Sequence, residues 1–397
     1  MKKILLLGAM QMHVPLILRA RERGIYVITC DYLPENVGHE YADESYYDST
    51  TDIDAVLALA KKCKVDGIMT FNSDPAALTA AVVADKLGLP GSGAEAVRIM
   101  SEKDRFRTFL HDNGFNAPAF GRYEDANSLL KDINKFRFPV ILKPVDSSGS
   151  KGVAIVKSHN EIKDIFDNAM NYSRCKRVIV EELINSKGAQ MHGDAFVRDG
   201  RIEFVYLGDH HFNRGINNLV PISTTFPSCH TEKEQQMVKD EVERFISKVG
   251  FRQGGINIEA RISSDDGKVY LIEVGPRNGG NFTPVVIQYA TGYSFIDSCI
   301  NSALGLDAFP QELSGKGFYA YMIVHSKNDG ILKGIDINAF LKERIIEKYD
   351  YLKPGDHVRT FKGSNAAIGV FLVKFDSMEQ MNSCVDNMDD YYNVVML

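Results

Sequence analysis

Gly255-Ile-Asn257-Ile-Glu259-Ala-Arg261-Ile262 and Val269-Tyr-Leu-Ile-Glu273-Val-Gly275-Pro-Arg277 are the two stretches that decide the fold of this chain. Both alternate apolar and polar residues, which predicts half-buried strands. Asp265-Asp266-Gly267 lies between them and favours a hairpin, with the glycine in the left-handed position of a three-residue loop. This register places Glu259 directly opposite Glu273, where facing Cβ atoms are ~4.5–5.5 Å apart.

The two facing glutamates indicate a cation site. Like charges directly opposite each other destabilise a sheet. Carboxylate oxygens together with nucleotide phosphates form the usual environment of Mg²⁺. The alternative, two exposed glutamates that repel each other weakly, fits poorly beside an isoleucine-rich face. Glu259 and Glu273 are therefore the candidate metal ligands.

A second stretch, residues 138–153, combines a lysine with small residues. A predicted strand delivers Lys143 at its end, and a loop then turns directly into another strand. Small residues allow successive backbone N–H groups to converge on phosphate oxygens. The loop is not a Walker A motif, because Lys151 is not followed by Ser or Thr and no helix begins there. A flexible hairpin with a surface lysine remains the alternative. The loop residues are Ser148, Gly149, Ser150 and Gly152.

Residues 178–184 form an apolar strand that ends in the adjacent carboxylates Glu181 and Glu182. Adjacent strand residues point to opposite sides, so at most one of the two faces a given pocket. The backbone of such a strand end can hydrogen-bond to the edge of an adenine. A solvated strand end is the alternative.

The first ninety residues alternate strand and helix patterns, which predicts a parallel, Rossmann-like sheet. Its first turn, Gly8-Ala-Met-Gln-Met-His13, lacks the G-x-G-x-x-G pattern, which disfavours a dinucleotide cofactor. Pro90-Gly91-Ser92-Gly93 is a plausible boundary. We expect a first domain over 1–92, a second domain over 93–310 and a C-terminal α+β domain over 311–397.

Composition excludes several classes of protein. The chain has 397 residues and a net charge of -6, so it lacks the basic field expected of a nucleic-acid-binding protein. Its six cysteines are scattered without a C-x-x-C pair, which is typical of reduced thiols in the cytosol. No apolar stretch is long enough to span a bilayer. We expect a cytoplasmic protein with no membrane or nucleic-acid partner.

Taken in order, these motifs resemble the ATP-grasp superfamily. The resemblance rests on Lys103 in Ser-Glu-Lys-Asp-Arg, on Lys143 with its loop, on residues 181–184 and on the Glu259/Glu273 pair. It is closest to amino-acid and dipeptide ligases and to carbamoyl-phosphate-synthase-like members. It implies an ATP-grasp fold of mixed α/β and α+β class, with a Rossmann-like domain before it and a small lid-like domain after it. It also implies that residues 93–310 form the ATP-grasp domain, with a small nucleotide-clamping lobe at about 117–182.

The resemblance also implies where ATP would bind. Lys103 and Lys143 would contact its phosphates, and loop 147–152 would close over them. Glu181 and the backbone of Glu182, Leu183 and Ile184 would hold adenine. The family usually holds ribose with a Glu a few residues further on, whereas this chain offers Gln190, whose amide can still hydrogen-bond to hydroxyls.

A departure from the family pattern concerns the metal. ATP-grasp members often place an Asn two residues after the second metal carboxylate, but this chain has Gly275 there. In the predicted register Asn257 lies opposite Gly275 on the same face, so its amide oxygen would replace the missing ligand. A water molecule is the alternative, because Mg²⁺ dehydrates reluctantly. Mn²⁺ could take the place of Mg²⁺.

The implied activity is an ADP-forming carboxylate–amine ligation through an acyl phosphate. Arg277 would stabilise the transferring phosphate and the oxyanion, and Asn281 lies in a segment that substrate could approach. His211 and Arg214 belong to a polar segment that either binds a carboxylate substrate or forms a hydrated loop. We expect a small carboxylic acid and an amine or other nucleophile as substrates, with room for a homodimer. Bicarbonate activation of the biotin-carboxylase or carbamoyl-phosphate type, and a non-catalytic ATP-binding sensor, remain alternatives.

Overall fold

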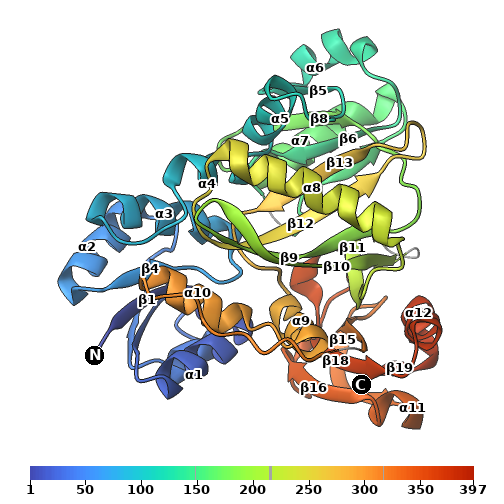
Figure 1. The fold of residues 1–397 in the computed structure, drawn as a ribbon. Helices are drawn as coiled ribbons and strands as arrows, with labels where there is room; N and C mark the ends of the chain where they lie inside the picture. Colours follow the sequence, from blue (N-terminus) through green and yellow to red (C-terminus); the bar gives the residue numbers. More distant parts are fainter. Residues whose placement is uncertain (148, 214–216, 316) are drawn as a thin grey trace.

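A computed structural model describes residues 1–147, 149–213, 217–315 and 317–397. In the described residues the strands form four sheets, and Figure 1 shows how they follow one another along the chain. The predicted calls on Ser148 and Arg214 lie outside the described residues. No helix in the described ranges is long and apolar enough to cross a membrane.

The N-terminal sheet is parallel, as the alternating pattern predicts. Its strands are β1 (Lys3–Leu7), β2 (Tyr26–Cys30), β3 (Glu44–Tyr46) and β4 (Gly67–Met69), in the order β3-β2-β1-β4. Helices α2 (Ile53–Cys63) and α3 (Asp74–Leu87) cover one face. Helices α1 (Val14–Glu22) and α10 (Phe295–Ala303) cover the other. One of the helices that cover the N-terminal sheet, α10, therefore comes from well beyond residue 92.

A small antiparallel sheet follows, reached through α4 (Ala94–Ser101) and α5 (Lys103–Asp112). Its strand order is β5 (Phe120–Tyr123), β8 (Val178–Glu182), β6 (Val140–Pro144) and β7 (Ala154–Val156). Helices α6 (Ala126–Asp132) and α7 (Ile162–Tyr172) pack on its apolar face. The strands fall within the predicted clamping lobe, and the strand that carries Lys143 pairs with β7 as expected.

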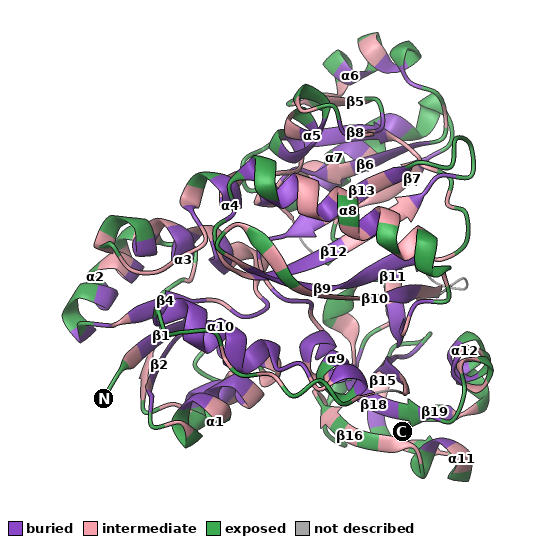
Figure 2. Cartoon of the chain, viewed as in Figure 1, coloured by how far each residue is buried: buried purple, intermediate pink, exposed green. Residues whose placement is uncertain are grey.

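A large antiparallel sheet forms the centre of the molecule. Its order is β13 (Val269–Gly275), β12 (Gly254–Ile262), β9 (Gln190–Arg198), β10 (Arg201–Asn213), β11 (Asn217–Phe226), β14 (Phe318–Val324), β18 (Gly369–Phe375) and β16 (Ile345–Asp350). Helix α8 (Glu232–Val249) begins in a capping box at Thr231 and lies across one face, and its buried side packs on the strands (Figures 1 and 2). Helix α9 (Thr283–Thr291) contacts β14.

The C-terminal segment is continuous with this large sheet. Strand β11 pairs with β14 across the predicted boundary at residue 310, and β18 and β16 follow. The remaining elements are β15 (Gly330–Ile337), β17 (His357–Val358), β19 (Tyr392–Met396), α11 (Ala339–Lys342) and α12 (Met378–Asp386). Residues 311–397 thus contribute a small second sheet of their own and also extend the central one.

The β12–β13 hairpin has the predicted register at Glu259, but for a different reason. Ile262 pairs with Val269, so the connection is longer than the predicted three-residue loop, and Gly267 has the expected left-handed φ of 70°. One β-bulge then shifts the pairing between Ala260↔Leu271 and Glu259↔Glu273. Ile272 is the extra residue, and it restores the register that the shorter loop would have given.

Candidate functional site

A row of polar side chains crosses one face of the large sheet. Cross-strand partners share a face. The pairings Glu273↔Glu259, Glu259↔His192, His210↔Thr224 and Thr224↔Tyr321 therefore extend this row from β13 to β14. The rings of His192 and His210 bridge β9 and β10, stacked with centroids 3.9 Å apart. The opposite face of β12, β13 and β9 is apolar and packs on α8.

The pair Glu259 and Glu273 has the chemistry of a divalent-cation site. Both are half-buried, and burial together with the Glu259 charge raises the pKa of Glu273. Within the described ranges no cluster of three or more His, Cys, Asp or Glu side chains forms a complete metal cage. Two carboxylates are nevertheless what Mg²⁺ usually takes from a protein, because it keeps waters and binds substrate phosphates. The donor set therefore fits the predicted cation.

Two neighbours orient the Glu259 carboxylate. Gln190 Nε2 donates to Glu259 Oε2 at 2.8 Å, and His210 Nε2 lies 3.7 Å from Glu259 Oε1. Gln190 also accepts from Arg261 Nε at 2.8 Å. Both ends of the Gln190 amide are thus engaged beside Glu259, and contact with ribose would have to use its second N–H or its second lone pair. The ribose assignment stays a prediction.

Asn257 lies opposite Gly275, as predicted. Its Nδ2 contacts His192 Nε2 at 2.8 Å, the Gly193 carbonyl at 3.1 Å and Asp194 Oδ1 at 2.8 Å. These contacts fix the orientation of the amide and define which end is its oxygen. Metal ligation by that oxygen stays a prediction.

Lys143 is held by Glu181. In the β6–β8 pairing Lys143 lies opposite Ile179, so Glu181 is its diagonal neighbour on the same face. Lys143 Nζ is 2.6 Å from Glu181 Oε2, and Arg107 Nε is 2.9 Å from Oε1. Burial acts to raise the pKa of Glu181, but Arg107 and Lys143 outweigh it and lower the pKa to about 2. Contact of Lys143 or Glu181 with a nucleotide stays a prediction.

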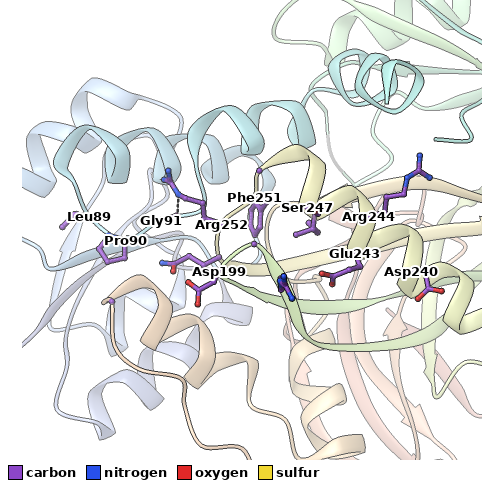
Figure 3. A pocket seen from close by; sticks show the side chains of 16 residues that line it. Leu89, Pro90, Gly91, Asp199, Asp240, Glu243, Arg244, Ser247, Phe251 and Arg252 are labelled. Carbon is purple, nitrogen blue, oxygen red and sulfur yellow. Dashed lines mark hydrogen bonds between the residues drawn. The ribbon is translucent and has the colours of Figure 1, made fainter. Parts of the chain in front are cut away.

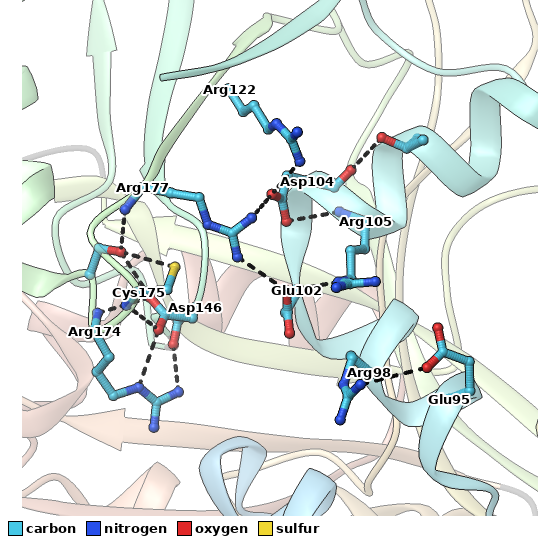
Figure 4. Close-up of polar contacts among 12 residues, drawn as sticks. Glu95, Arg98, Glu102, Asp104, Arg105, Arg122, Asp146, Arg174, Cys175 and Arg177 are labelled. Carbon is cyan, nitrogen blue, oxygen red and sulfur yellow. Dashed lines mark hydrogen bonds and ion pairs between the residues drawn. The ribbon is translucent and has the colours of Figure 1, made fainter. Parts of the chain in front are cut away.

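Lys103 also contacts the chain itself. Its backbone N–H donates to the Val145 carbonyl at 3.1 Å, and its Nζ donates to the Ser147 carbonyl at 2.6 Å. The residues on either side of it anchor α5 to the small lobe, because Arg177 pairs with Asp104 at 2.6 Å and with Glu102 at 3.3 Å (Figure 4). Both predicted phosphate lysines therefore border the 146–152 loop or its strand.

The predicted phosphate loop has the backbone that its composition favours. Gly149 and Gly152 have φ of 66° and 71°, a region that glycine adopts without strain, and Ser150 has a φ of 58°, which is uncommon for other residues. Ser150 Oγ donates to the Leu219 carbonyl on β11 at 2.8 Å, so the loop reaches the central sheet. A run of this kind can turn backbone N–H groups toward an anion.

The predicted adenine strand end has several backbone groups already in use. Glu182 N donates to the Ala119 carbonyl at 2.9 Å, and Leu183 N donates to the Pro139 carbonyl at 3.3 Å. The Ile184 carbonyl accepts from Arg261 Nη1 at 2.9 Å. Adenine binding at this strand end stays a prediction.

Arg277 lies where the strand β13 ends, and the N-terminal domain holds it. Its Nε and Nη2 donate to the two carboxylate oxygens of Asp74, each at 2.7 Å, and its Nη1 donates to the Asn278 carbonyl at 3.1 Å. Asp74 is the first residue of α3. The bidentate pair fixes the plane of the guanidinium group near Glu273. The charge of Arg277 acts to lower the pKa of Glu273, although burial dominates and raises it.

The predicted substrate residues are divided between the two faces of the sheet. His211 Nδ1 lies 3.1 Å from Asp386 Oδ1 on α12, and its Nε2 lies 3.0 Å from Thr225 Oγ1, so it faces away from Glu259. His210 occupies the site face instead. Asn281 hydrogen-bonds to Tyr321 and therefore lies at the β14 end of the polar row. Burial raises the pKa of Tyr321 to about 12, although the hydrogen bonds with Thr224 and Asn281 act to lower it.

Several residues of the site were not predicted from the sequence. Asp194 is fully buried, and its carboxylate accepts from Asn257, from Asn278 Nδ2 at 3.2 Å and from Gly279 N at 2.9 Å. It thereby anchors the segment that follows Arg277. The alternation of Gln190, His192 and Asp194 along one strand was the sequence signal that these residues share a face. The other residues missed were Arg107, Asp74, His192, Thr224 and Tyr321.

A large groove elsewhere on the molecule shares no residue with this site. It has a volume of about 1120 Å³ and lies between α8, the β9–β10 turn and residues 89–91 (Figure 3). Two of its charged side chains have partners: Arg252 pairs with Asp85, and Glu243 accepts from Ile202 N at 2.9 Å.

Comparison with known proteins identifies the fold and its central domain. Residues 136–285 match the model of the ATP-grasp domain. The chain is 24% identical over 318 residues to the N-terminal section of the carbamoyl phosphate synthase large chain of Methanopyrus kandleri, which covers 76% of this chain and 55% of that protein. The chain thus spans about half the length of this curated relative.

Solved structures agree over the whole length. The L-amino acid ligase from Bacillus licheniformis superposes with a TM-score of 0.83 at 21% identity, covering 100% of this chain and 99% of that one. Phosphoribosylglycinamide synthetase from Anaerococcus prevotii superposes with a TM-score of 0.78 at 24% identity, covering 100% of both chains. The predicted fold, an ATP-grasp fold preceded by a parallel sheet, is confirmed.

Proposed function

Because the chain carries an ATP-grasp domain within an ATP-grasp fold, we propose that it is an ATP- and Mg²⁺-dependent carboxylate–amine ligase that releases ADP and phosphate. The observation that carries the proposal is the facing pair Glu259 and Glu273, bordered by Gln190, His210 and Arg277. A like-charged pair on a half-buried face is stabilised by a cation, and the surrounding lysines supply charge for phosphates.

The chain's residues divide the chemistry between them. Glu259 and Glu273 would hold Mg²⁺, which supplies neutralisation of the phosphate charge. Lys143 and Lys103 would bind the phosphates and align the γ-phosphoryl group with the substrate carboxylate. A carboxylate oxygen forms a bond to the γ-phosphorus as the bond to the ADP oxygen breaks. The products of this step are an acyl phosphate and ADP.

The second step forms the new C–N bond. The amine attacks the acyl carbon, passes its proton to solvent or a nearby base, and expels phosphate as the C–O bond breaks. Arg277, held by Asp74, would stabilise the oxyanion of the tetrahedral intermediate and the departing phosphate. Asp194 would act indirectly, by fixing the backbone at Gly279 beside that position.

A screen for ADP release tests the proposal. The protein is incubated with Mg²⁺ and ATP against pooled amino acids and other small carboxylic acids, with and without amine acceptors, and products are identified by mass spectrometry. We expect ADP and phosphate to form in equal amounts only when both an acid and an acceptor are present. ADP release that is independent of any acid would contradict ligation.

A second candidate is bicarbonate activation, and the similarity to the carbamoyl phosphate synthase large chain favours it specifically. Bicarbonate is then the activated acid, and ammonia or another amine is the acceptor. The same screen separates the two candidates, since only this one gives ADP with bicarbonate in the absence of any organic acid.

A further inference from the structure

The bulge at Ile272 decides which way Glu273 points. Next to the turn, the pairing Ile262↔Val269 continues to Ala260↔Leu271, and in that register Glu273 would lie opposite Ile258. A shift of one residue moves a side chain to the other face, here the apolar face under α8. The bulge is therefore what brings Glu273 opposite Glu259.

One buried arginine grips this bulge. Arg107 on α5 is 2% exposed. Its Nη1 donates to the Leu271 carbonyl at 3.1 Å, and its Nη2 donates to the Ile272 carbonyl at 2.9 Å. Successive carbonyls of a regular strand point to opposite edges, so a single guanidinium reaches both only where the alternation is broken. The rigid fork of donors suits this bulged conformation.

The same guanidinium also holds the phosphate side of the site. Arg107 Nε donates to Glu181 Oε1 at 2.9 Å, and the other oxygen of Glu181 binds Lys143 at 2.6 Å. Arg107 lies four residues after Lys103, so the two side chains leave the same face of α5. Arg107 thus contacts strand β13 and the Lys143–Glu181 pair, and it lies on the same helix as Lys103.

We propose that Arg107 is a positioning residue that stabilises the Ile272 bulge and so sets the affinity of the Glu259/Glu273 pair for a divalent cation. The inference rests on the proposed function for the identity of the cation site. Arg107 contacts neither substrate nor metal in this role. Its effect reaches the metal through the register of β13.

The test measures Mn²⁺ binding at saturating ADP, together with amide hydrogen exchange of residues 271–275 in the protein without metal or nucleotide. Removing Arg107 alone leaves Glu181 with less charge compensation, so the variant is Arg107→Met combined with Glu181→Gln. Glu181→Gln alone is the reference, because it keeps the contacts to the bulge. Arg105→Met, on the exposed side of the same helix, is the matched control. Arg107→Lys keeps a cation beside Glu181 but loses the fork.

We expect the double variant to bind Mn²⁺ about 10-fold or more weakly than Glu181→Gln, and Arg107→Lys to bind it about 10-fold or more weakly than the wild type. Losses of this size follow when a residue that supports a metal ligand is removed. Exchange of residues 271–275 is expected to accelerate in both. Arg105→Met should stay within about threefold of the wild type in Mn²⁺ affinity, below the 10–100-fold typical of such losses, and Glu181→Gln serves only as the reference for the double variant.

Unchanged Mn²⁺ affinity and unchanged exchange in Arg107→Lys or in the double variant would overturn the inference. The exchange measurement needs no ligand. If the wild type itself bound no Mn²⁺ with ADP, the metal site of the proposed function would fail, while exchange would still decide whether Arg107 holds the bulge.

Discussion

The lysine side and the carboxylate side of the site differ in how their charges are balanced. On the lysine side, the buried Glu181 lies between Arg107 and Lys143, so each charge has a partner within the protein. On the carboxylate side, Glu259 and Glu273 face each other, and burial and mutual repulsion raise the pKa of Glu273. The first cluster is stable without a ligand, whereas the second gains from a cation.

The difference indicates what each side must do when a nucleotide arrives. In the proposed function the two carboxylates would only have to receive the metal. In the same proposed function Lys143 would turn toward a phosphate, and Arg107 would continue to compensate the charge of Glu181. Removing one partner of a buried ion pair costs free energy because the other charge is left uncompensated. The charge of Arg107 lowers this cost for Glu181.

Replacing Glu273 by Gln should have the largest effect and opposite signs in the two assays. Loss of a metal carboxylate should lower ATP turnover by at least about 100-fold, because charge neutralisation by the metal contributes several kcal/mol. Removal of the repulsion should raise the stability of the protein without ligand by up to about 1 kcal/mol. Activity assays and urea unfolding measure the two. A destabilised apo variant would contradict the contrast between the two sides.

Lys143→Ala should also abolish productive ATP binding, but it should destabilise the protein without ligand. From the sequence alone little change in stability is expected, since the lysine would be needed only with phosphates. The contact with buried Glu181 revises this to a loss of about 1–3 kcal/mol. Lys151→Ala, in the exposed part of the same loop, is the control. Equal unfolding free energies for the two variants would contradict the pairing.

The Glu181 cluster should give a defined acid dependence. The pKa of Glu181 is about 2 in the folded protein and 4.5 in its reference state, so the folded state binds the proton more weakly. The stabilisation is complete above about pH 4.5 and is lost as the pH falls toward 2. Relative to Glu181→Gln, the wild type should lose about 1 kcal/mol between pH 6 and pH 3.5, measured by urea unfolding. A constant difference would place the carboxylate outside the pair.

Gln190→Ala should have the smallest effect, and it separates two roles. If Gln190 acts by orienting Glu259, the Mg²⁺ requirement should rise by only a few-fold, a loss of about 1 kcal/mol for one hydrogen bond. The ratio of turnover with ATP to turnover with 2′-deoxy-ATP should then be the same as in the wild type. A change in that ratio with an unchanged Mg²⁺ requirement would restore the ribose role.

Local pattern was enough to predict the elements and the facing of Glu259 and Glu273. The alternation in residues 255–262 and 269–275 gives both strands, and it places Glu259 and Glu273 on one face once the register is known. The register itself depends on the Ile272 bulge, which is stabilised by an arginine more than 160 residues away in sequence. No turn rule contains that contact, so the three-residue loop was wrong although the pairing was right.

Residues whose role depends on pairing between distant strands could not be assigned from sequence. The register between β9 and β10 decides which of His210 and His211 lies on the same face of the sheet as Glu259. The sequence of that segment is polar on both faces and does not indicate this register. The Lys143–Glu181 pair needs the β6–β8 register, and Arg107 looks like one of several charges on an amphipathic helix. The motifs that the superfamily resemblance supplies mark the strands, but not the contacts among them.

The most direct test of carboxylate activation is transfer of oxygen from the acid to phosphate. Once the screen has identified an acid, it is labelled with ¹⁸O in its carboxyl group and incubated with Mg²⁺, ATP and the acceptor, and the released phosphate is examined by mass spectrometry. The account predicts one ¹⁸O atom in each phosphate formed by ligation. Phosphate released by background hydrolysis of ATP in the Glu273→Gln variant should carry no ¹⁸O. Phosphate that carries no label from the acid, while ADP and the ligated product accumulate, would contradict an acyl-phosphate route.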